Sequence, residues 1–505
     1  MTEPVFGIGK PTPVVLVGTD GNTYDASGGG GGAGNASAAN QQLQLTQETE
    51  TNTRIGEVQA SPTANTMLGR LKDLYTAITG TLTVSGTVTA NLSATDNAVL
   101  DNIDVNTGNT VSSIDSAKDA GGRFKVSSLT TLFDGKTLNA DNTNLWHTAG
   151  TGTGTFDSTG VDANGFDMSV TSGQWYVRQS NRFMPYFSGK PQSIELTLEN
   201  FHDQANVVKR AGYFSSTAVS PHATVLDGIW LENTGTGVDF VISNQGTETL
   251  RVAQASFNVN PLTGQDWSKF NVVLIEFLWL GGLVARLSVG KTNGDLQLAH
   301  TYSHVGQVGM MFKSPNQPVR YEIRSSTGVG SLTAICCQVA TEGGTSEAGE
   351  SASFITKSGA TVNVTTPAVG TIYALLGLKK QVANRDIAVK LVTFGVVNSA
   401  STDSGILMLI KDPTLSTTLT YTNVGRVQQG IPTDFANPAT ITAGSGTIIA
   451  SVPVSQNGEH QELTEDYLLW LQNNIADTLS EYIVAYMPTT ATQTNCATMT
   501  YKVYN

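Results

Sequence analysis

Hydrophobic and polar positions alternate with a period of two through most of the chain after residue 123. The runs are short, and Gly, Asn, Asp and Pro separate them, as in SIELTLEN (193–200), VRYEIRS (319–325) and EYIVAYM (481–487). A period of two places alternate side chains on opposite faces of a strand. Short strands at regular spacing, with little helix between them, indicate antiparallel sandwiches. We therefore predict a mainly β chain with two jelly-roll-like β-sandwich domains, over residues 123–330 and 331–505.

Two stretches test this assignment. Residues 270–289 are the most apolar of the chain, but Glu276, Arg286 and the pair Gly281-Gly282 interrupt them. The pattern indicates two buried strands joined by a tight turn, and no segment has the roughly 18 consecutive apolar residues of a transmembrane helix. Residues 461–479 are compatible with a helix on a sandwich edge or with a strand and a turn. Strand and loop are favoured for the second half.

Residues 61–122 have a different pattern. An amphipathic helix is expected over 61–78, because its apolar positions recur at helical spacing: Met67, Leu68, Leu71, Leu74, Tyr75 and Ile78. Residues 81–92 then alternate like a strand, and residues 96–115 carry sparse apolar positions broken by Gly108. One copy of this segment cannot bury its own apolar faces. We therefore expect a self-associating stalk in a symmetric, elongated homo-oligomer.

Residues 1–60 resemble a terminal arm. Residues 28–34 (GGGGGAG) have the composition of a flexible linker, and residues 35–60 are polar with few apolar positions. Such an arm contributes little to a core and is often ordered by docking on another molecule.

The charge composition argues against two classes of binding partner, nucleic acids and anionic membranes. Charged residues make up 14% of the chain, the net charge is −13 and the sequence contains no cluster of Lys and Arg. Nucleic-acid binding and attraction to an anionic membrane both depend on such clusters. We expect neither nucleic-acid binding nor membrane insertion.

Motif checks give no catalytic or cofactor site. Gly135-Lys136-Thr137 and Gly290-Lys291-Thr292 lack the earlier glycine of a phosphate-binding loop. His300 and His304 would share a strand face and could bind a metal or meet symmetry copies, but ordinary polar edge residues explain them better. The three cysteines are expected to be small buried side chains, and adjacent Cys336 and Cys337 should point to opposite faces. No cofactor, metal or enzymatic activity is expected.

Aromatic residues offer one binding hypothesis. Trp175, Tyr176 and Tyr186, the last within FMPYF (183–187), could form a platform on which sugar rings stack. The alternative is that these rings fill the sandwich core, which is the commoner use of large aromatic side chains.

Several segments resemble structural proteins of tailed bacteriophage particles. Residues 55–78 (IGEVQASPTANTMLGRLKDLYTAI) are similar to a recurrent adaptor helix, and LDNIDVNTGN (100–109) to a piece that follows it. Residues 277–344, with FLWLGGLVARLSVG, SPNQPVRYEIRSSTG and TAICCQVATEGG, resemble a module of phage fibre and head-decoration proteins. Residues 350–505 resemble, less distinctly, the β-rich tip that follows this module.

The resemblance implies a homotrimer that is made in the host cytoplasm and sits on the particle surface. Residues 1–60 would dock on capsid or tail proteins, and the β domains would point outward. A non-enzymatic head fibre or decoration protein is slightly preferred, because the long repeats of tail fibres are absent. A tail fibre or adhesin that recognises host carbohydrate is the alternative, and a polysaccharide depolymerase is third.

Overall fold

The computed structural model describes only part of the chain. The described residues are 16–17, 23–24, 42–43, 46, 69–71, 73–75, 119–122, 128–136, 138–159, 164–217, 222, 224–344, 349–400, 402–455, 458–463, 467–490 and 492–504. They fall into two compact units, Met1–Ile103 and Asp104–Asn505. In the first unit, β1 (Leu16–Val17) and β2 (Thr23–Tyr24) form an antiparallel pair, and residues 69–71 and 73–75 are helical.

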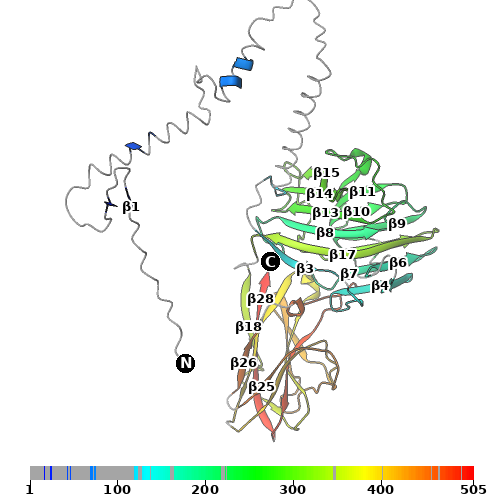
Figure 1. The fold of residues 1–505 in the computed structure, drawn as a ribbon. Helices are drawn as coiled ribbons and strands as arrows, with labels where there is room; N and C mark the ends of the chain where they lie inside the picture. The colour runs from blue at the N-terminus through cyan, green and yellow to red at the C-terminus, as the bar shows by residue number, and fades with distance from the viewer. Residues whose placement is uncertain are drawn as a thin grey trace, which may run out of the picture. The chain divides into compact units, whose positions relative to one another are not determined.

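The second unit contains two antiparallel β-sandwiches (Figure 1). One sheet of the first sandwich has seven strands in the order β12-β11-β10-β9-β16-β7-β4. Their bounds are β4 (Trp146–Gly150), β7 (Trp175–Ser180), β9 (Val207–Ser216), β10 (Val225–Asn233), β11 (Val238–Asn244), β12 (Thr247–Ala253) and β16 (Val319–Ser325). The other sheet has the order β15-β14-β13-β8-β17-β6-β5, with β3 also paired to β17. Its bounds are β3 (Leu129–Asp134), β5 (Thr153–Phe156), β6 (Phe166–Val170), β8 (Gln192–Glu199), β13 (Asn271–Leu278), β14 (Val284–Gly290), β15 (Leu296–Ser303) and β17 (Gly330–Glu342).

The second sandwich, here called the tip domain, begins at β18. Its smaller sheet has the order β18-β28-β21-β26, with β19 paired to β28. The bounds are β18 (Glu350–Ile355), β19 (Val364–Thr366), β21 (Ala388–Asn398), β26 (Glu459–Glu462) and β28 (Gln493–Tyr504). The larger sheet has the order β23-β24-β20-β27-β22-β25. Its bounds are β20 (Tyr373–Lys380), β22 (Gly405–Lys411), β23 (Thr420–Val424), β24 (Val427–Ile431), β25 (Thr447–Val454) and β27 (Tyr482–Pro488). Short 3-10 turns lie at η1 (Gln254–Ser256), η2 (Val382–Asn384) and η3 (Tyr467–Leu469).

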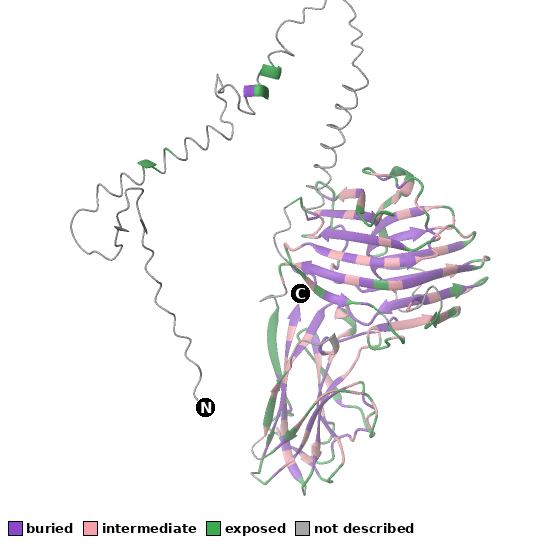
Figure 2. Cartoon of the chain, viewed as in Figure 1, coloured by how far each residue is buried: buried purple, intermediate pink, exposed green. Residues whose placement is uncertain are grey.

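Alternation along the strands explains why these residues form sandwiches. In β8, Ile194, Leu196 and Leu198 are fully buried while the residues between them are half-buried. The same alternation runs through β28. Apolar side chains from facing sheets meet in one core per sandwich, and Figure 2 shows the buried residues on the strands of both. The prediction of a mainly β chain with antiparallel sandwich domains is confirmed.

The predicted hairpin is present. β13 and β14 pair antiparallel, with Glu276 opposite Arg286, and Gly281 and Gly282 lie in the connecting turn. Both glycines have positive φ values, 89° and 149°, which residues with a Cβ atom rarely adopt. Within 461–479, the described residues form the end of β26, η3 and loop rather than an α-helix.

The boundary between the sandwiches differs from the predicted one at residues 330 and 331. Strand β17 (Gly330–Glu342) pairs with β8 on one side and with β6 and β3 on the other, inside the first sandwich. The change of domain therefore falls between β17 and β18. The predicted boundary is too early: Gly330 and Ser331 are the first residues of β17, and the residues at 326–329 lead into it from β16.

The two sandwiches contact each other through buried side chains. Tyr504 at the end of β28 packs edge-on against Phe187 of the first sandwich, with 5.9 Å between ring centres. The backbone N–H of Asn473 donates to the carbonyl of Asn181 at 3.0 Å. Trp470 and Tyr504 are buried together with the core of the first sandwich.

The predicted self-associating helix is described in part. Met67, Leu68 and Ile78 lie outside the described residues. Leu71, Leu74 and Tyr75 lie in helical residues and are 55%, 57% and 68% exposed in the single chain. The predicted trimer and the rest of the stalk therefore stay predictions. Among the described residues, no helix is both long and apolar enough to cross a membrane.

Candidate functional site on the seven-stranded sheet

Charged side chains gather on the face of the seven-stranded sheet that points away from the core. In β16, Val319, Tyr321 and Ile323 are buried in the core. Alternation therefore directs Arg320, Glu322 and Arg324 to the opposite face. On that face, Arg210 of β9 and Glu232 of β10 lie beside them, because β16 pairs with β9 and β9 with β10.

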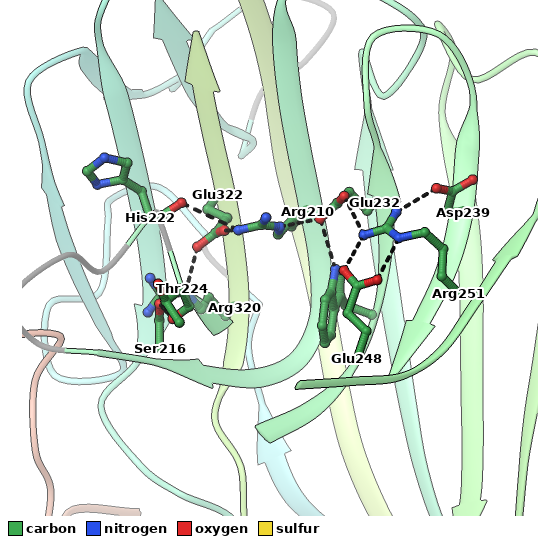
Figure 3. Close-up of polar contacts among 11 residues, drawn as sticks. Arg210, Ser216, His222, Thr224, Glu232, Asp239, Glu248, Arg251, Arg320 and Glu322 are labelled. Atoms are coloured by element: carbon green, nitrogen blue, oxygen red, sulfur yellow. Dashed lines mark hydrogen bonds and ion pairs between the residues drawn. The ribbon is translucent and has the colours of Figure 1, made fainter. Parts of the chain in front are cut away.

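Arg210 is the centre of this network (Figure 3). Its Nε donates to Glu232, and its Nη1 donates to Glu322 at 2.5 Å. Glu322 also accepts from the Nε of Arg320 at 3.0 Å, and Arg320 donates to the side-chain oxygen of Gln179 at 2.6 Å. All these side chains are buried.

A second arginine extends the network to the sheet edge. Arg251 of β12 donates to Glu232 at 2.9 Å, to Asp239 at 2.5 Å and to Glu248 at 2.6 Å (Figure 3). The indole N–H of Trp230 also points to Glu232, at 3.4 Å. Neighbouring strands of the sheet are thus tied together by charge-assisted hydrogen bonds, which are stronger than neutral ones.

The electrostatics of Glu232 limit what this network can do chemically. Burial alone would raise its pKa, but the guanidiniums of Arg210 and Arg251 outweigh burial and hold the pKa below its ordinary value. Its oxygens already accept from both arginines. A carboxylate held ionised in this way is a poor general acid, and its contacts fit a structural role.

Beside the network lies a half-buried group of three residues: Trp175 of β7, Arg324 of β16 and His222 of the β9–β10 connection. Arg324 is the cross-strand partner of Trp175. The imidazole of His222 stacks on the indole, with 4.4 Å between ring centres and 14° between planes. Burial lowers the pKa of His222, and the nearby Arg324, Arg320 and Arg210 lower it further against the opposing effect of Glu322.

The three aromatic residues of the possible sugar platform lie apart, and the core alternative describes Tyr186. Trp175 lies on the outer face, and its neighbour Tyr176 points to the other side, 6.2 Å from the ring of Phe166. Tyr186 is buried, 5.8 Å from Phe277, and its hydroxyl accepts from the backbone N–H of Trp279. The three rings share no surface, because the strand alternates at 175–176 and FMPYF fills the core.

The two histidines considered as metal ligands are buried rather than exposed at an edge. His300 contacts the rings of Phe240 and Phe257 and accepts from the N–H of Asn258. The Nδ1 of His304 lies 2.7 Å from the hydroxyl of Tyr302. Within the described part of the chain, no three His, Cys, Asp or Glu side chains are placed to hold a metal ion.

A shallow hollow of about 360 Å³ lies on the outer face of the eight-stranded sheet. Its lining includes Asp134, Lys136, Glu195, Thr197 and Cys336. The expectation of three buried cysteines is correct for Cys337 only: Cys336 is exposed and Cys496 half-buried, and all three are free. Partial burial and then Asp134 raise the pKa of Cys336, which keeps it a thiol at neutral pH.

Sequence reasoning missed the charged network. A signal was present in VRYEIRS, where Arg320, Glu322 and Arg324 alternate with apolar residues. The partners Arg210, Glu232 and Arg251 come from separate strands, so a search for runs of Lys and Arg could not find them. These charged side chains come together only when the strands pair in the folded protein.

Comparison with known proteins gives distant likenesses only. No protein-family model matches the chain, and no curated protein matches it. Among solved structures, a β-glucanase of Bacillus licheniformis is 14% identical, with a TM-score of 0.28 over 42% of this chain and 98% of the other. A carbohydrate esterase from a Shiga toxin-encoding bacteriophage is 11% identical, with a TM-score of 0.27 over 43% of this chain and 100% of the other. A legume lectin-like domain from Entamoeba histolytica is 9% identical, with a TM-score of 0.27 over 42% and 98%.

Proposed function

We propose that the chain is a non-enzymatic structural protein on the surface of a tailed-phage particle. It forms a homotrimer through the stalk at 61–122, is attached through residues 1–60 and presents the two β-sandwiches outward. A head fibre or decoration protein is preferred over a tail fibre. The sequence resemblance of residues 55–78, 100–109 and 277–344 to phage particle proteins supports this assignment.

The observation that carries the proposal is the exposure of an apolar helical stripe. Leu71, Leu74 and Tyr75 are all more than half exposed in the single chain. Burial of each such leucine stabilises an assembly by about 1.5–3 kcal/mol. A second and third copy of the same helix supply the complementary apolar surface, as in other helical bundles. The flanking Arg70 and Asp73 are exposed and stay available to solvent.

Electron microscopy of purified particles labelled with an antibody against residues 350–505 tests the location. Label at regular positions on the head agrees with the proposal, and unlabelled particles contradict it. Deletion of residues 1–60 provides a matched variant. The deleted protein should keep its melting temperature, because the arm has few apolar residues, and should be absent from particles. Incorporation at normal copy number would contradict the assigned role of the arm.

A second candidate is an adhesin that recognises host carbohydrate. The outer face of the seven-stranded sheet favours it, because a half-buried aromatic group and a half-buried guanidinium group lie together there, on Trp175 and Arg324. Many weak polar sites on a trimer gain about 10²–10⁴ in avidity when they act together.

Incubation of the pure protein with host polysaccharide separates the adhesin from a depolymerase. An adhesin retains polysaccharide without shortening it. If oligosaccharides appear, and the variant Glu322→Gln folds but no longer releases them, the chain is an enzyme and the non-enzymatic proposal is wrong.

A further inference from the structure

The outer face of the seven-stranded sheet carries four arginines and four carboxylates, but the carboxylates are bonded to only three of the arginines. Arg324 is the fourth arginine of this face and lies on the same strand as Arg320 and Glu322. Arg210 and Arg320 both bond to Glu322, which leaves that carboxylate engaged. Glu232 is already shared between Arg210 and Arg251. These carboxylates therefore accept hydrogen bonds from other arginines, and they act on Arg324 only through space.

Arg324 differs from the other arginines of the network. Among the described residues it has no ion pair and no hydrogen-bond partner for its guanidinium, and its Nε is shielded from solvent without a partner. The side chain is only half-buried. Burial lowers the pKa of Arg324, and Arg210 lowers it further, against the opposing effects of Glu322 and Glu232. An anion placed against the guanidinium would offset the cost of burial and satisfy the unused Nε–H donor.

An aromatic surface lies directly beside this guanidinium. Trp175 is the cross-strand partner of Arg324 on the same face, and His222 stacks on the indole. Side chains directly opposite each other in an antiparallel pair lie about 5 Å apart at Cβ. The Nδ1 of His222 is also shielded from solvent without a hydrogen-bond partner among the described residues. The Nε of Arg324 and the Nδ1 of His222, both without a hydrogen-bond partner among the described residues, thus lie beside the stacked rings of Trp175 and His222.

We propose that this group is a binding site for a carboxylate-bearing sugar of an acidic polysaccharide, with Arg324 receiving the carboxylate and Trp175 and His222 packing against the ring. The planar guanidinium matches a carboxylate in two-point geometry. The aromatic surface explains why a sugar acid fits better than a free inorganic anion. Glu322 stays in the network as a positioning residue that fixes Arg320 and Arg210 below the site.

This site would give the proposed adhesin a ligand class, namely sugar acids. Its biological role rests on the adhesin proposal. Its test is independent of where the protein sits. Antibody labelling decides particle location, whereas binding by the purified full-length chain decides this site. Failure of one therefore does not imply failure of the other.

Titration calorimetry with a glucuronate oligosaccharide tests the site. A glucose oligosaccharide of equal length and inorganic phosphate serve as the other two probes. Wild-type protein should bind the glucuronate oligosaccharide, bind the glucose oligosaccharide at least tenfold more weakly, and bind phosphate more weakly still. Arg324→Gln should weaken glucuronate binding about tenfold to a hundredfold, the range for loss of a charged hydrogen bond.

Controls separate the site from net charge and from misfolding. Arg426→Gln removes the same charge at an exposed position of the tip domain and should leave binding unchanged. Arg324→Lys keeps the charge but loses the two-point geometry, and should recover part of the affinity. His222 lies outside the strands, so His222→Ala should weaken binding severalfold without changing the melting temperature.

The proposal would be overturned by no binding of the glucuronate oligosaccharide to wild-type protein, by equal binding to folded Arg324→Gln, or by equal affinity for the glucose oligosaccharide. Phosphate binding as tight as glucuronate binding would mean an anion site without sugar recognition, and would equally reject the assignment.

Discussion

The guanidinium of Arg182 lies over the indole of Trp470, with 3.8 Å between the guanidinium carbon and the ring centre. Arg182 belongs to the first sandwich and Trp470 to the tip domain, and both are buried. Tyr504 also packs against this indole, at 5.1 Å between ring centres. A cation–π contact contributes most when it is desolvated, as here. The two sandwiches are therefore joined by a specific buried contact.

Trp470→Ala should uncouple the two sandwiches. Loss of a buried Trp typically costs about 3–5 kcal/mol, and here most of the lost contact lies at the domain junction. Scanning calorimetry should show one transition for the wild type and two separated transitions for the variant. Val369→Ala, at an exposed position of the tip domain, is the control and should unfold like the wild type. A single unshifted transition for Trp470→Ala would mean that the junction adds no coupling.

The junction should also make stability depend on pH through Lys380. Its Nζ donates to the carbonyl of Arg385 and to Asn473. Burial, opposed in part by Asp386, lowers the pKa of Lys380 from 10.5 to about 7. Between these two values the unfolded chain binds more protons than the folded protein, so the free energy of unfolding rises with pH. The slope from this group is at most about 1.4 kcal/mol per pH unit.

Urea unfolding at pH 7, 8 and 9 measures this slope. Lys380→Met should flatten it, and Lys357→Met, at an exposed position in the loop after β18, should not. Lys209 contributes in the same direction, because burial also lowers its pKa to about 7. Some slope should therefore persist in the Lys380 variant. An unchanged slope in Lys380→Met would show that this amine does not titrate in that range.

Arg210→Met should destabilise the first sandwich by about 3–5 kcal/mol, because Glu232 and Glu322 lose their shared buried cation. Chemical unfolding monitored by Trp fluorescence gives the value. Lys136→Met breaks the exposed pair with Asp134 and should change stability little. Equal effects of the two substitutions would contradict a structural role for the Arg210 network.

Leu71→Asp combined with Leu74→Asp should prevent self-association. The two carboxylates would occupy the apolar stripe in every copy, so the cost multiplies with the number of chains. Multi-angle light scattering should report monomers or loose aggregates. Arg70→Asp, on an exposed position of the same helical residues, is the control and should keep the assembly. A trimer that survives the double substitution would place assembly in the β domains.

Local patterns predicted the parts of the fold that depend on neighbouring residues. The turn at Gly281-Gly282 and the burial of β13 follow from the sequence alone, because alternation and glycine conformation act within a few residues. The burial of Tyr186 agrees with the core alternative, although its ring partners Phe277 and Trp279 lie far away in sequence. The domain boundary was misplaced because β17 gains its partners from β3, β6 and β8, far away in sequence.

The candidate site depends even more on contacts between residues that are far apart in the sequence. Arg324 and Trp175 are separated by about 150 positions in the sequence, and only the pairing of β16 with β7 brings them together. The sequence hypothesis grouped Trp175 with Tyr176 and Tyr186, whereas its neighbours on the outer face are Arg324 and His222.

Completion of the smaller sheet of the tip domain depends on strand β28. It pairs with β18, β19 and β21, so the smaller sheet of the tip domain stays incomplete until residues 493–504 have left the ribosome. Tyr504 then covers Phe187. A chain that stops before residue 493 would keep strand edges and that apolar contact open, which favours aggregation.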